Sequence, residues 1–153
     1  MPKKIRLSLE VETDLDTVGI SSALKDYKLA FNINANLNTK LKRIEDFVFR
    51  PEKSNTELGF SLFHEYLSDA NTSICLLQNR QVEGYLMSVF RQADYFLILQ
   101  NPINENIISQ YISSLKTIPK VNAAFQLKLS GAKSYASFAQ DLELHLMEYS
   151  KKP

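Results

Sequence analysis

The side chains that could perform chemistry are few, and they do not cluster along the chain. The two histidines are His64 and His145, and the single cysteine is Cys75. A metal site needs three or four His, Cys or carboxylate ligands at geometric spacing. A nucleophilic cysteine needs a partner histidine and a turn that exposes its sulfur beside an oxyanion hole. Because the sequence has neither pattern, we predict no metal site, no cofactor and no catalytic residue, which favours a non-enzymatic protein.

Two smaller arrangements are candidates for a site, and each has a simpler explanation. His64 beside Glu65 could transfer a proton, but the alternating run around it predicts a half-exposed histidine on a strand. Asp14 and Asp16 could bind a cation, but a calcium loop needs further oxygen ligands and a glycine. We therefore interpret the two aspartates as turn formers. Cys75 lies in an apolar run and is expected in the core.

Nucleic acids and nucleotides are not expected as ligands. The net charge is +1, whereas nucleic-acid-binding domains carry a marked basic excess. The four glycines form no phosphate-binding loop. Four phenylalanines near Arg43 and Arg50 could imitate an RNA-stacking sheet, but the glycine–aromatic signature is missing, so we predict that they pack in the core. The four are Phe47, Phe49, Phe60 and Phe63.

Length and composition predict one ordinary domain. A chain of 153 residues that is 44% hydrophobic can bury a core without disulfides. We expect residues 1–153 to form a single domain, with a core over about 4–129 and a further helix over about 133–150. The N-terminus lacks the apolar stretch of a signal peptide, and no window resembles a membrane span. With one cysteine, these features predict a cytoplasmic protein that does not enter a membrane.

The first third of the chain is expected to form a strand, a helix and a second strand. Residues 5–12 alternate in polarity without a fault, which predicts a half-buried strand. Residues 19–22 look like the approach to a helix, with Ser21 or Ser22 as its N-cap. The helix should end near Asn38 in the left-handed conformation. Its predicted core-facing stripe consists of Leu24, Tyr27, Phe31 and Ala35.

The middle of the chain predicts an antiparallel meander. Residues 42–49, 58–66 and 73–78 are short runs rich in strand formers, separated by polar turns. Residues 84–90 are ambiguous between a strand, an extended loop and a helical turn, and we lean towards a strand or loop.

The most apolar run, residues 95–99, is expected to be a central strand with both faces covered. A turn, a helix to Pro119 and a strand over 121–129 should follow it. Asp94 directly precedes this run, and we predict that its carboxylate accepts hydrogen bonds from the backbone of residues 85–91. A terminal amphipathic helix then begins at Ser134.

These elements predict an α+β fold. We expect a mostly antiparallel sheet of about six strands, two helices packed on it and an additional C-terminal helix. The strand–helix–strand order in residues 5–49 and 95–129 leaves a ferredoxin-like or ACT-like arrangement possible.

Two stretches resemble a bacterial family named by its signature, the IPExxxVDY family. Residues 19–31 are similar to the N-terminal helix region of that family; they include Gly19, Ser21, Asp26 and Tyr27. In residues 85–98, Asp94 and Tyr95 match the end of the signature. Ala93 stands where the family has valine, and residues 87–89 replace its Ile-Pro-Glu. The resemblance implies a small cytoplasmic bacterial protein from a family without an established activity.

Two functions remain open at this level. A patterned core without a catalytic constellation favours a module that binds another protein or a second copy of itself. The alternative is an ACT-like regulatory domain or enzyme subunit that binds a small molecule at the turn over residues 101–104 or between sheet and helix.

Overall fold

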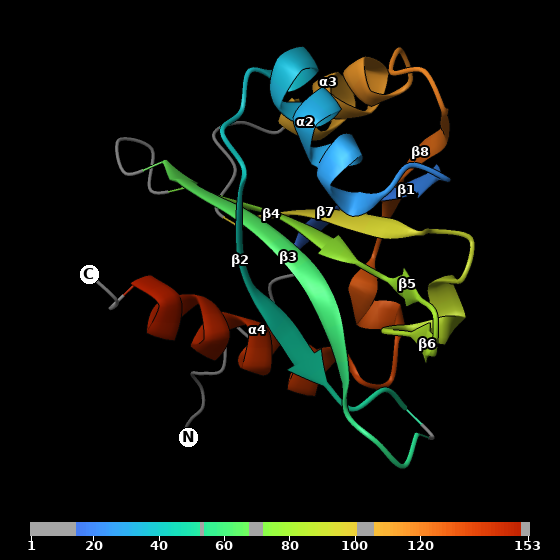
Figure 1. Ribbon diagram of the computed structural model, residues 1–153, viewed down its shortest axis with the longest axis vertical. Coiled ribbons are helices and arrows are strands. Elements are labelled where there is room, and N and C mark those ends of the chain that lie inside the picture. The colour runs from blue at the N-terminus through green and yellow to red at the C-terminus, as the bar shows by residue number, and fades with distance from the viewer. Residues whose placement is uncertain (1–14, 53, 68–71, 101–105, 151–153) are drawn as a thin grey trace.

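A six-stranded antiparallel sheet forms the centre of the computed structural model, which describes residues 15–52, 54–67, 72–100 and 106–150 (Figure 1). The strand order across the sheet is β2-β3-β4-β7-β1-β8, and every neighbouring pair is antiparallel. The strands are β1 (Asp16–Ser22), β2 (Lys42–Phe49), β3 (Leu58–Leu67), β4 (Thr72–Gln78), β7 (Tyr95–Gln100) and β8 (Val121–Leu127). The predicted α+β class is confirmed.

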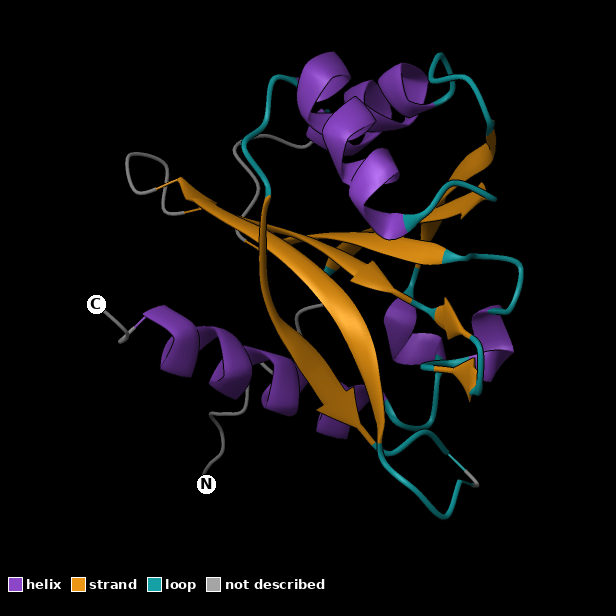
Figure 2. Ribbon diagram, in the orientation of Figure 1, coloured by secondary structure: helices purple, strands orange, loops and turns teal. Residues whose placement is uncertain are grey.

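Helices cover both faces of this sheet (Figure 2). Helices α2 (Asp26–Leu37) and α3 (Ile107–Leu115) lie on one face, and α4 (Tyr135–Ser150) lies on the other. The sheet therefore separates two hydrophobic clusters, and its central strands contribute to both. No helix in the described ranges is long and apolar enough to cross a membrane.

Strand β7 is the central strand that its apolar run predicts. It pairs with β4 on one side and β1 on the other, and its first five residues are all buried. Phe96 and Ile98 pack on the α4 side, whereas Tyr95, Leu97 and Leu99 pack on the side of α2 and α3. Burial on both faces explains the absence of polar alternation in this run.

The unit β7–α3–β8 confirms the predicted strand–helix–strand layout, but its two strands are not neighbours. Both pair antiparallel with β1, so β7 and β8 run parallel to each other with β1 between them. Strand β8 ends at Leu127, two residues before the predicted end, because Leu129–Gly131 forms a 3-10 turn. The turn expected over residues 101–104 lies outside the described residues.

The prediction for residues 16–22 is wrong. They form strand β1 rather than a loop and a helix approach, and neither Ser21 nor Ser22 caps α2. Val18 and Ile20 are buried beneath α2 and α3, and Gly19 lies under Phe125 and Leu127 of β8. Since both faces are covered and one position is glycine, the strand shows no alternating pattern. The strand predicted over residues 5–12 lies outside the described residues.

Helix α2 is in the predicted place but turns the opposite stripe to the core. Leu29, Ala30 and Ile33 are buried, whereas Tyr27 and Phe31 are 56% and 73% exposed. Both sets have helical spacing, so periodicity alone could not choose between them. The helix ends as predicted, with Asn38 in the left-handed region at φ 59°.

Helix α4 forms part of the hydrophobic core and is not an addition to a core that is complete without it. Its buried side chains Phe138, Leu142 and Leu146 join the cluster that contains Phe47 and Phe60. Phe138 meets Phe47 edge-on, with ring centroids 5.7 Å apart. The packing of the phenylalanines in the core is therefore confirmed, and α4 supplies much of the cluster on its face of the sheet.

Candidate functional site

Asp94 and Tyr95 lie at the start of β7, beside a shallow cleft of about 290 Å³. The loop from Ser22 to Asp26, which joins β1 to α2, forms one wall of the cleft. Gln78, at the end of β4, and Arg80, two residues further on, form the other wall with Asp94 and Tyr95. The cleft thus brings together segments that lie far apart in the sequence.

Asp94 fastens this loop to β7. Its Oδ2 accepts a 2.8 Å hydrogen bond from the backbone N–H of Ser22, and its Oδ1 pairs with Nε of Arg80 at 2.9 Å. Its own backbone N–H donates to the carbonyl of Ile20 at 2.8 Å. The predicted partners in residues 85–91 are therefore wrong. The carboxylate still fixes the start of the strand, but it does so across the sheet.

Asn79, rather than Asp94, bonds the backbone of the segment that precedes β7. Its side chain is fully buried, and its Nδ2 donates to the carbonyls of Phe90 and Ala93 at 3.1 and 2.9 Å. Its Oδ1 accepts from the backbone N–H of Met87 at 2.8 Å. One amide thereby satisfies three backbone groups of the segment before Asp94. No motif marks Asn79; the only sequence signal is an amide residue directly after a buried strand.

The ambiguous residues 84–90 are now described. Gly84–Tyr85 forms β6, which pairs with β5 (Arg80–Gln81), and Ser88–Phe90 is a 3-10 turn. The expected strand or loop is thus a very short hairpin strand followed by a turn. The backbone N–H of Leu86 donates to the carbonyl of Asn79 at 2.7 Å, so this hairpin is fastened by the same residue.

Tyr95 holds the other end of the loop. Its hydroxyl donates a 2.6 Å hydrogen bond to the carbonyl of Leu24. Burial, with smaller contributions from Asp26 and Asp94, raises the pKa of Tyr95 to about 12. The phenol therefore keeps its proton near neutral pH and serves as a donor, not as a base.

Ser22 completes the support of the loop. Its Oγ donates to the carbonyl of Lys120 at 2.8 Å and accepts from the backbone N–H of Leu24 at 3.1 Å. Lys120 occupies the left-handed region at φ 74°, where a residue with a side chain is uncommon. The loop is therefore bonded to β7 and to the turn before β8.

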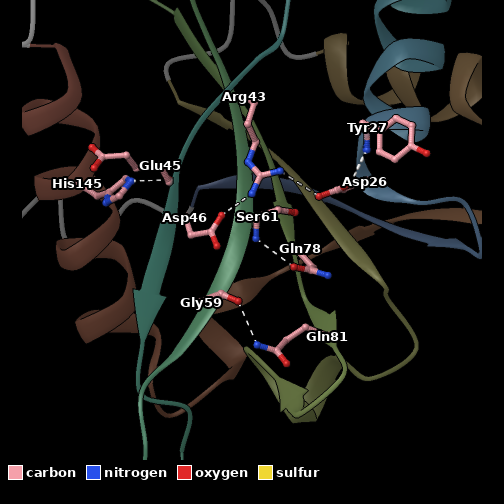
Figure 3. Close-up of polar contacts among 10 residues, drawn as sticks. All are labelled: Asp26, Tyr27, Arg43, Glu45, Asp46, Gly59, Ser61, Gln78, Gln81 and His145. Carbon is pink, nitrogen blue, oxygen red and sulfur yellow. Dashed lines mark hydrogen bonds and ion pairs between the residues drawn. The ribbon is translucent and has the colours of Figure 1, made fainter.

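Charged side chains of β2 and α2 form ion pairs on the face of the sheet that carries α2 (Figure 3). Arg43 pairs with Asp46 at 2.6 Å and with Asp26 at 3.3 Å, and its guanidinium lies 5.6 Å from the centre of the Phe63 ring. Arg43 and Asp46 are exposed and Asp26 is partly buried, so the pair with Asp46 in particular contributes little to stability. Tyr27 donates its backbone N–H to Asp26 at 2.7 Å, and its ring is exposed.

Two side-chain amides hydrogen-bond to the backbone of β3 beyond the point where β3 and β4 stop pairing (Figure 3). The backbone N–H of Ser61 donates to Oε1 of Gln78 at 3.0 Å, and Nε2 of Gln81 donates to the carbonyl of Gly59, also at 3.0 Å. Within the described part of the chain, Oγ of Ser61 is the buried side-chain polar atom without a hydrogen-bond partner.

His64 and Cys75 lie on the opposite face, beneath α4. Nε2 of His64 lies 2.8 Å from Oγ of Ser73, and its ring meets the ring of Tyr149 edge-on. Burial lowers the pKa of His64, partly offset by Glu65. Burial raises the pKa of the Cys75 thiol to about 12, so the sulfur is protonated near neutral pH and unsuited to nucleophilic attack.

The remaining candidates are dispersed. His145 on α4 lies with its Nε2 3.0 Å from the carbonyl of Glu45, far from His64 in sequence and on a different element. Asp16 lies in β1, whereas Asp14 is outside the described residues. Among the residues that the structure describes, no three His, Cys, Asp or Glu side chains form a group that could hold a metal ion.

Fold and site together define an α+β protein whose best-organised polar site fastens a loop and borders an open cleft. The cleft offers Lys25 and Arg80 beside Asp26 and Asp94, a mixed set that can hydrogen-bond a polar molecule. The chain matches no protein-family model, no curated protein and no solved structure.

Proposed function

We propose that this protein acts by binding a protein strand, either of another protein or of a second copy of itself, rather than by catalysis. The observation that carries this proposal is the character of β8, which lies at one edge of the sheet that the described residues form. An edge strand presents unpaired backbone N–H and C=O groups, and such groups can bind another strand.

The two edges of the sheet differ sharply. Strand β2, at one edge, carries Lys42, Arg43, Glu45 and Asp46, and its register shifts within this run. Charges and irregular pairing are the usual devices that keep an edge from binding other strands. Strand β8, at the other edge, has seven residues and contains no charge, no proline and no glycine. Its pairing with β1 shifts register once, at Asn122, and from Ala123 to Leu127 the strand is regular and lacks these devices.

The outer stripe of α2 supports the same class of function. Tyr27 and Phe31 lie one helical turn apart and are mostly exposed, and Ala35 on the next turn is exposed as well. Large aromatic side chains are frequent in protein interfaces, because they bury much area at low entropic cost. This stripe offers a second contact surface, on the face that carries α2 and α3.

The test is to place charges on β8 without touching the core. Asn122 and Gln126 are exposed, so the variant Asn122→Lys/Gln126→Lys should fold normally. We expect the wild-type protein to associate with itself or retain a partner in light scattering and affinity capture, and the variant to lose that association. The matched variant Asn55→Lys/Gln92→Lys makes the same exchanges at exposed positions elsewhere and should keep it. A strictly monomeric wild-type protein that captures nothing would contradict the proposal.

A second candidate function is small-molecule binding, which the cleft beside Asp94 favours. Its volume of about 290 Å³ and its mixed charges suit a small polar metabolite, as in a regulatory domain or enzyme subunit. A metabolite panel should then raise the melting temperature of the wild-type protein but not that of the Lys25→Ala/Arg80→Ala variant. Equal shifts in both proteins, or none, would exclude this cleft.

We also propose that the chain is a cytoplasmic bacterial relative of the IPExxxVDY family. The support is that the two stretches with the resemblance meet in space. Asp94 bonds Ser22, and Tyr95 bonds Leu24, so residues 85–98 contact residues 19–31 directly. The single cysteine, which cannot form an intrachain disulfide, supports a reducing compartment.

A further inference from the structure

Strand β8 lies within a stretch whose charged side chains are all positive. Residues 106–140 contain four lysines and no aspartate, glutamate or arginine, whereas the whole chain has a net charge of +1. The four are Lys116, Lys120, Lys128 and Lys133. All are exposed, and none forms an ion pair with another described residue. The neighbouring strand β1 adds one carboxylate, Asp16, so this edge of the sheet keeps a positive excess.

The lysines flank the strand on both sides. Lys116 and Lys120 come before β8, and Lys128 and Lys133 come after it. Between Lys120 and Lys128 the strand is uncharged over a length of about 26 Å, at a rise of about 3.3 Å per residue. A second strand that lies along β8 therefore meets positive charge at both ends and none in its middle.

The backbone of Lys120 is held in a conformation that packing does not explain. Its φ of 74° lies in the left-handed region, which favours glycine and asparagine over a residue with a long side chain. The side chain is exposed, so it gains little from burial. The hydroxyl of Ser22 donates to the carbonyl of Lys120 at 2.8 Å and fixes this turn. Such an unfavourable conformation at an exposed charge is typical of a binding site.

The two faces of β8 differ in polarity where the strand is regular. Phe125 and Leu127 pack half-buried on the α4 face. Gln126 is exposed and pairs with Val18, which lies on the face of α2 and α3. Side chains of a bound strand lie beside those of β8 on the same face. A matching strand therefore has apolar residues on the α4 face and polar residues on the other.

We infer that β8 binds an extended acidic segment of another protein, with carboxylates at both ends of an uncharged stretch in which apolar and polar residues alternate. The inference rests on the proposed function, because it names the strand that β8 binds. Backbone hydrogen bonds along the edge supply affinity, and the charges at the ends select the partner. A second copy of this chain is disfavoured, since it would bring four further lysines to the same edge.

A synthetic peptide of about eleven residues tests the partner's chemistry. It has two glutamates at each end, with threonine and valine alternating between them, and its binding to the full-length chain is followed by fluorescence anisotropy. We expect saturable binding that weakens as ionic strength rises from about 0.01 M to about 0.1 M, because the Debye length falls from about 30 Å to about 10 Å. Absence of binding up to about 1 mM overturns the inference.

Two altered peptides test the pattern. The peptide with lysines in place of its glutamates should not bind, and the peptide with its valines grouped together should bind more weakly than the alternating one. Equal binding by all three would overturn the inference.

Removal of lysines at β8 tests the site. Lys120→Asn/Lys128→Gln removes one charge at each end, and asparagine suits the left-handed conformation, so the variant should melt no lower than the wild type. At about 0.1 M ionic strength we expect it to bind the acidic peptide about fivefold more weakly. Lys28→Gln/Lys40→Gln removes two exposed charges elsewhere and should bind within about twofold of the wild type. Equal losses in both variants would overturn the inference.

Charges placed within β8 report the sign of the partner. Asn122→Glu/Gln126→Glu and Asn122→Lys/Gln126→Lys both put charge beside the uncharged middle of the peptide, where it loses water. The glutamate variant also repels the acidic ends, so it should bind more weakly than the lysine variant. A single-stranded oligonucleotide of about ten nucleotides should not displace the peptide. Displacement at equal concentration would assign the lysines to a nucleic acid and overturn the inference.

Failure of this inference can be told apart from failure of the proposed function. If the glutamate and lysine variants lose a captured partner to the same extent, binding at β8 stands and its preference for an acidic partner is wrong. If both variants keep the partner, both proposals are wrong. Binding of the acidic peptide should slow hydrogen exchange of the β8 backbone amides, and binding without this change would overturn β8 as the site.

Discussion

The carboxylate of Asp94 accepts a 2.8 Å hydrogen bond from the backbone N–H of Ser22, which lies 72 positions earlier in the chain. We expect Asp94→Ala to lower the free energy of unfolding by about 1–3 kcal/mol, because a partly buried N–H loses its acceptor. Asp94→Asn keeps an acceptor oxygen and should cost less. Urea unfolding followed by circular dichroism measures both values.

The control for Asp94 is Asp46→Ala, which removes an exposed carboxylate that also pairs with an arginine. It should change stability by less than about 1 kcal/mol, as is usual for surface ion pairs. If Asp46→Ala and Asp94→Ala lower the free energy of unfolding equally, the hydrogen bond to Ser22 contributes no more to stability than an exposed ion pair does.

Asn79 should tolerate no substitution. Asn79→Asp has nearly the same shape, but its carboxylate cannot donate to the carbonyls of Phe90 and Ala93. We expect it to lower the free energy of unfolding by about 3 kcal/mol or more, because a charge and two carbonyls are left buried without partners. Asn122→Asp, at an exposed position, should change the free energy of unfolding little. A similarly small loss for Asn79→Asp would contradict the hydrogen bonds described for Asn79.

Gly19→Ala should destabilise the sheet. A Cβ atom there would lie 2.7 Å from Cδ1 of Leu127 and 2.7 Å from Cε2 of Phe125, so β8 must shift. We expect a loss of about 1–3 kcal/mol, typical of overpacking in a tight site. Gly131→Ala is the matched control, since the nearest atom to its Cβ is Cζ of Phe90 at 3.9 Å. If both variants melt at the wild-type temperature, the packing of β8 on β1 is looser than described.

His64 should make stability depend on pH in the acidic range. Burial lowers its pKa below the ordinary 6.5, so between these two values the unfolded chain binds a proton that the folded chain does not. The contribution of His64 to stability is therefore fully present above pH 6.5 and is lost as the pH falls below that value. His64→Gln removes this contribution, so the loss between pH 8 and pH 5 should be smaller than in the wild type. If His64→Gln loses as much stability between pH 8 and pH 5 as the wild type does, the prediction is wrong.

Cys75 should be unreactive in the folded protein. Its pKa of about 12 keeps the thiol protonated at pH 8, and its side chain is buried. A disulfide reagent such as dithionitrobenzoate should label it only after urea unfolding, at a rate that follows the unfolded population. Fast labelling of the native protein would show that this part of the cluster beneath α4 opens readily.

Much of the fold followed from local patterns. Residues 42–49 and 58–66 have the composition and boundaries of strands, and both proved to be strands. The run from Tyr95 to Leu99 could be placed at the centre of the sheet, because only a strand covered on both faces needs five apolar residues in a row. Asn38 marked the end of α2 through a backbone preference that acts within a few residues. The prediction that the next helix runs to Pro119 is wrong, since α3 ends at Leu115.

The candidate site was only half accessible to such reasoning. Asp94 and Tyr95 could be selected, since a carboxylate beside the most apolar strand needs a partner. Their partners in the loop after β1 could not be found, because those bonds join residues brought together by strand pairing. Asn79 was missed for the same reason: its three bonds depend on the path of the segment between β4 and β7.

The sequence by itself determined the class of fold, most of the elements and the absence of charge from β8, because these are properties of short segments. The tertiary structure alone decided that residues 16–22 form a strand, which stripe of α2 faces the sheet, and that α4 completes the core. It also placed β8 at an edge. The physical reason is that burial and strand order depend on which distant segments pack together, and periodicity within one segment carries no information about its neighbours.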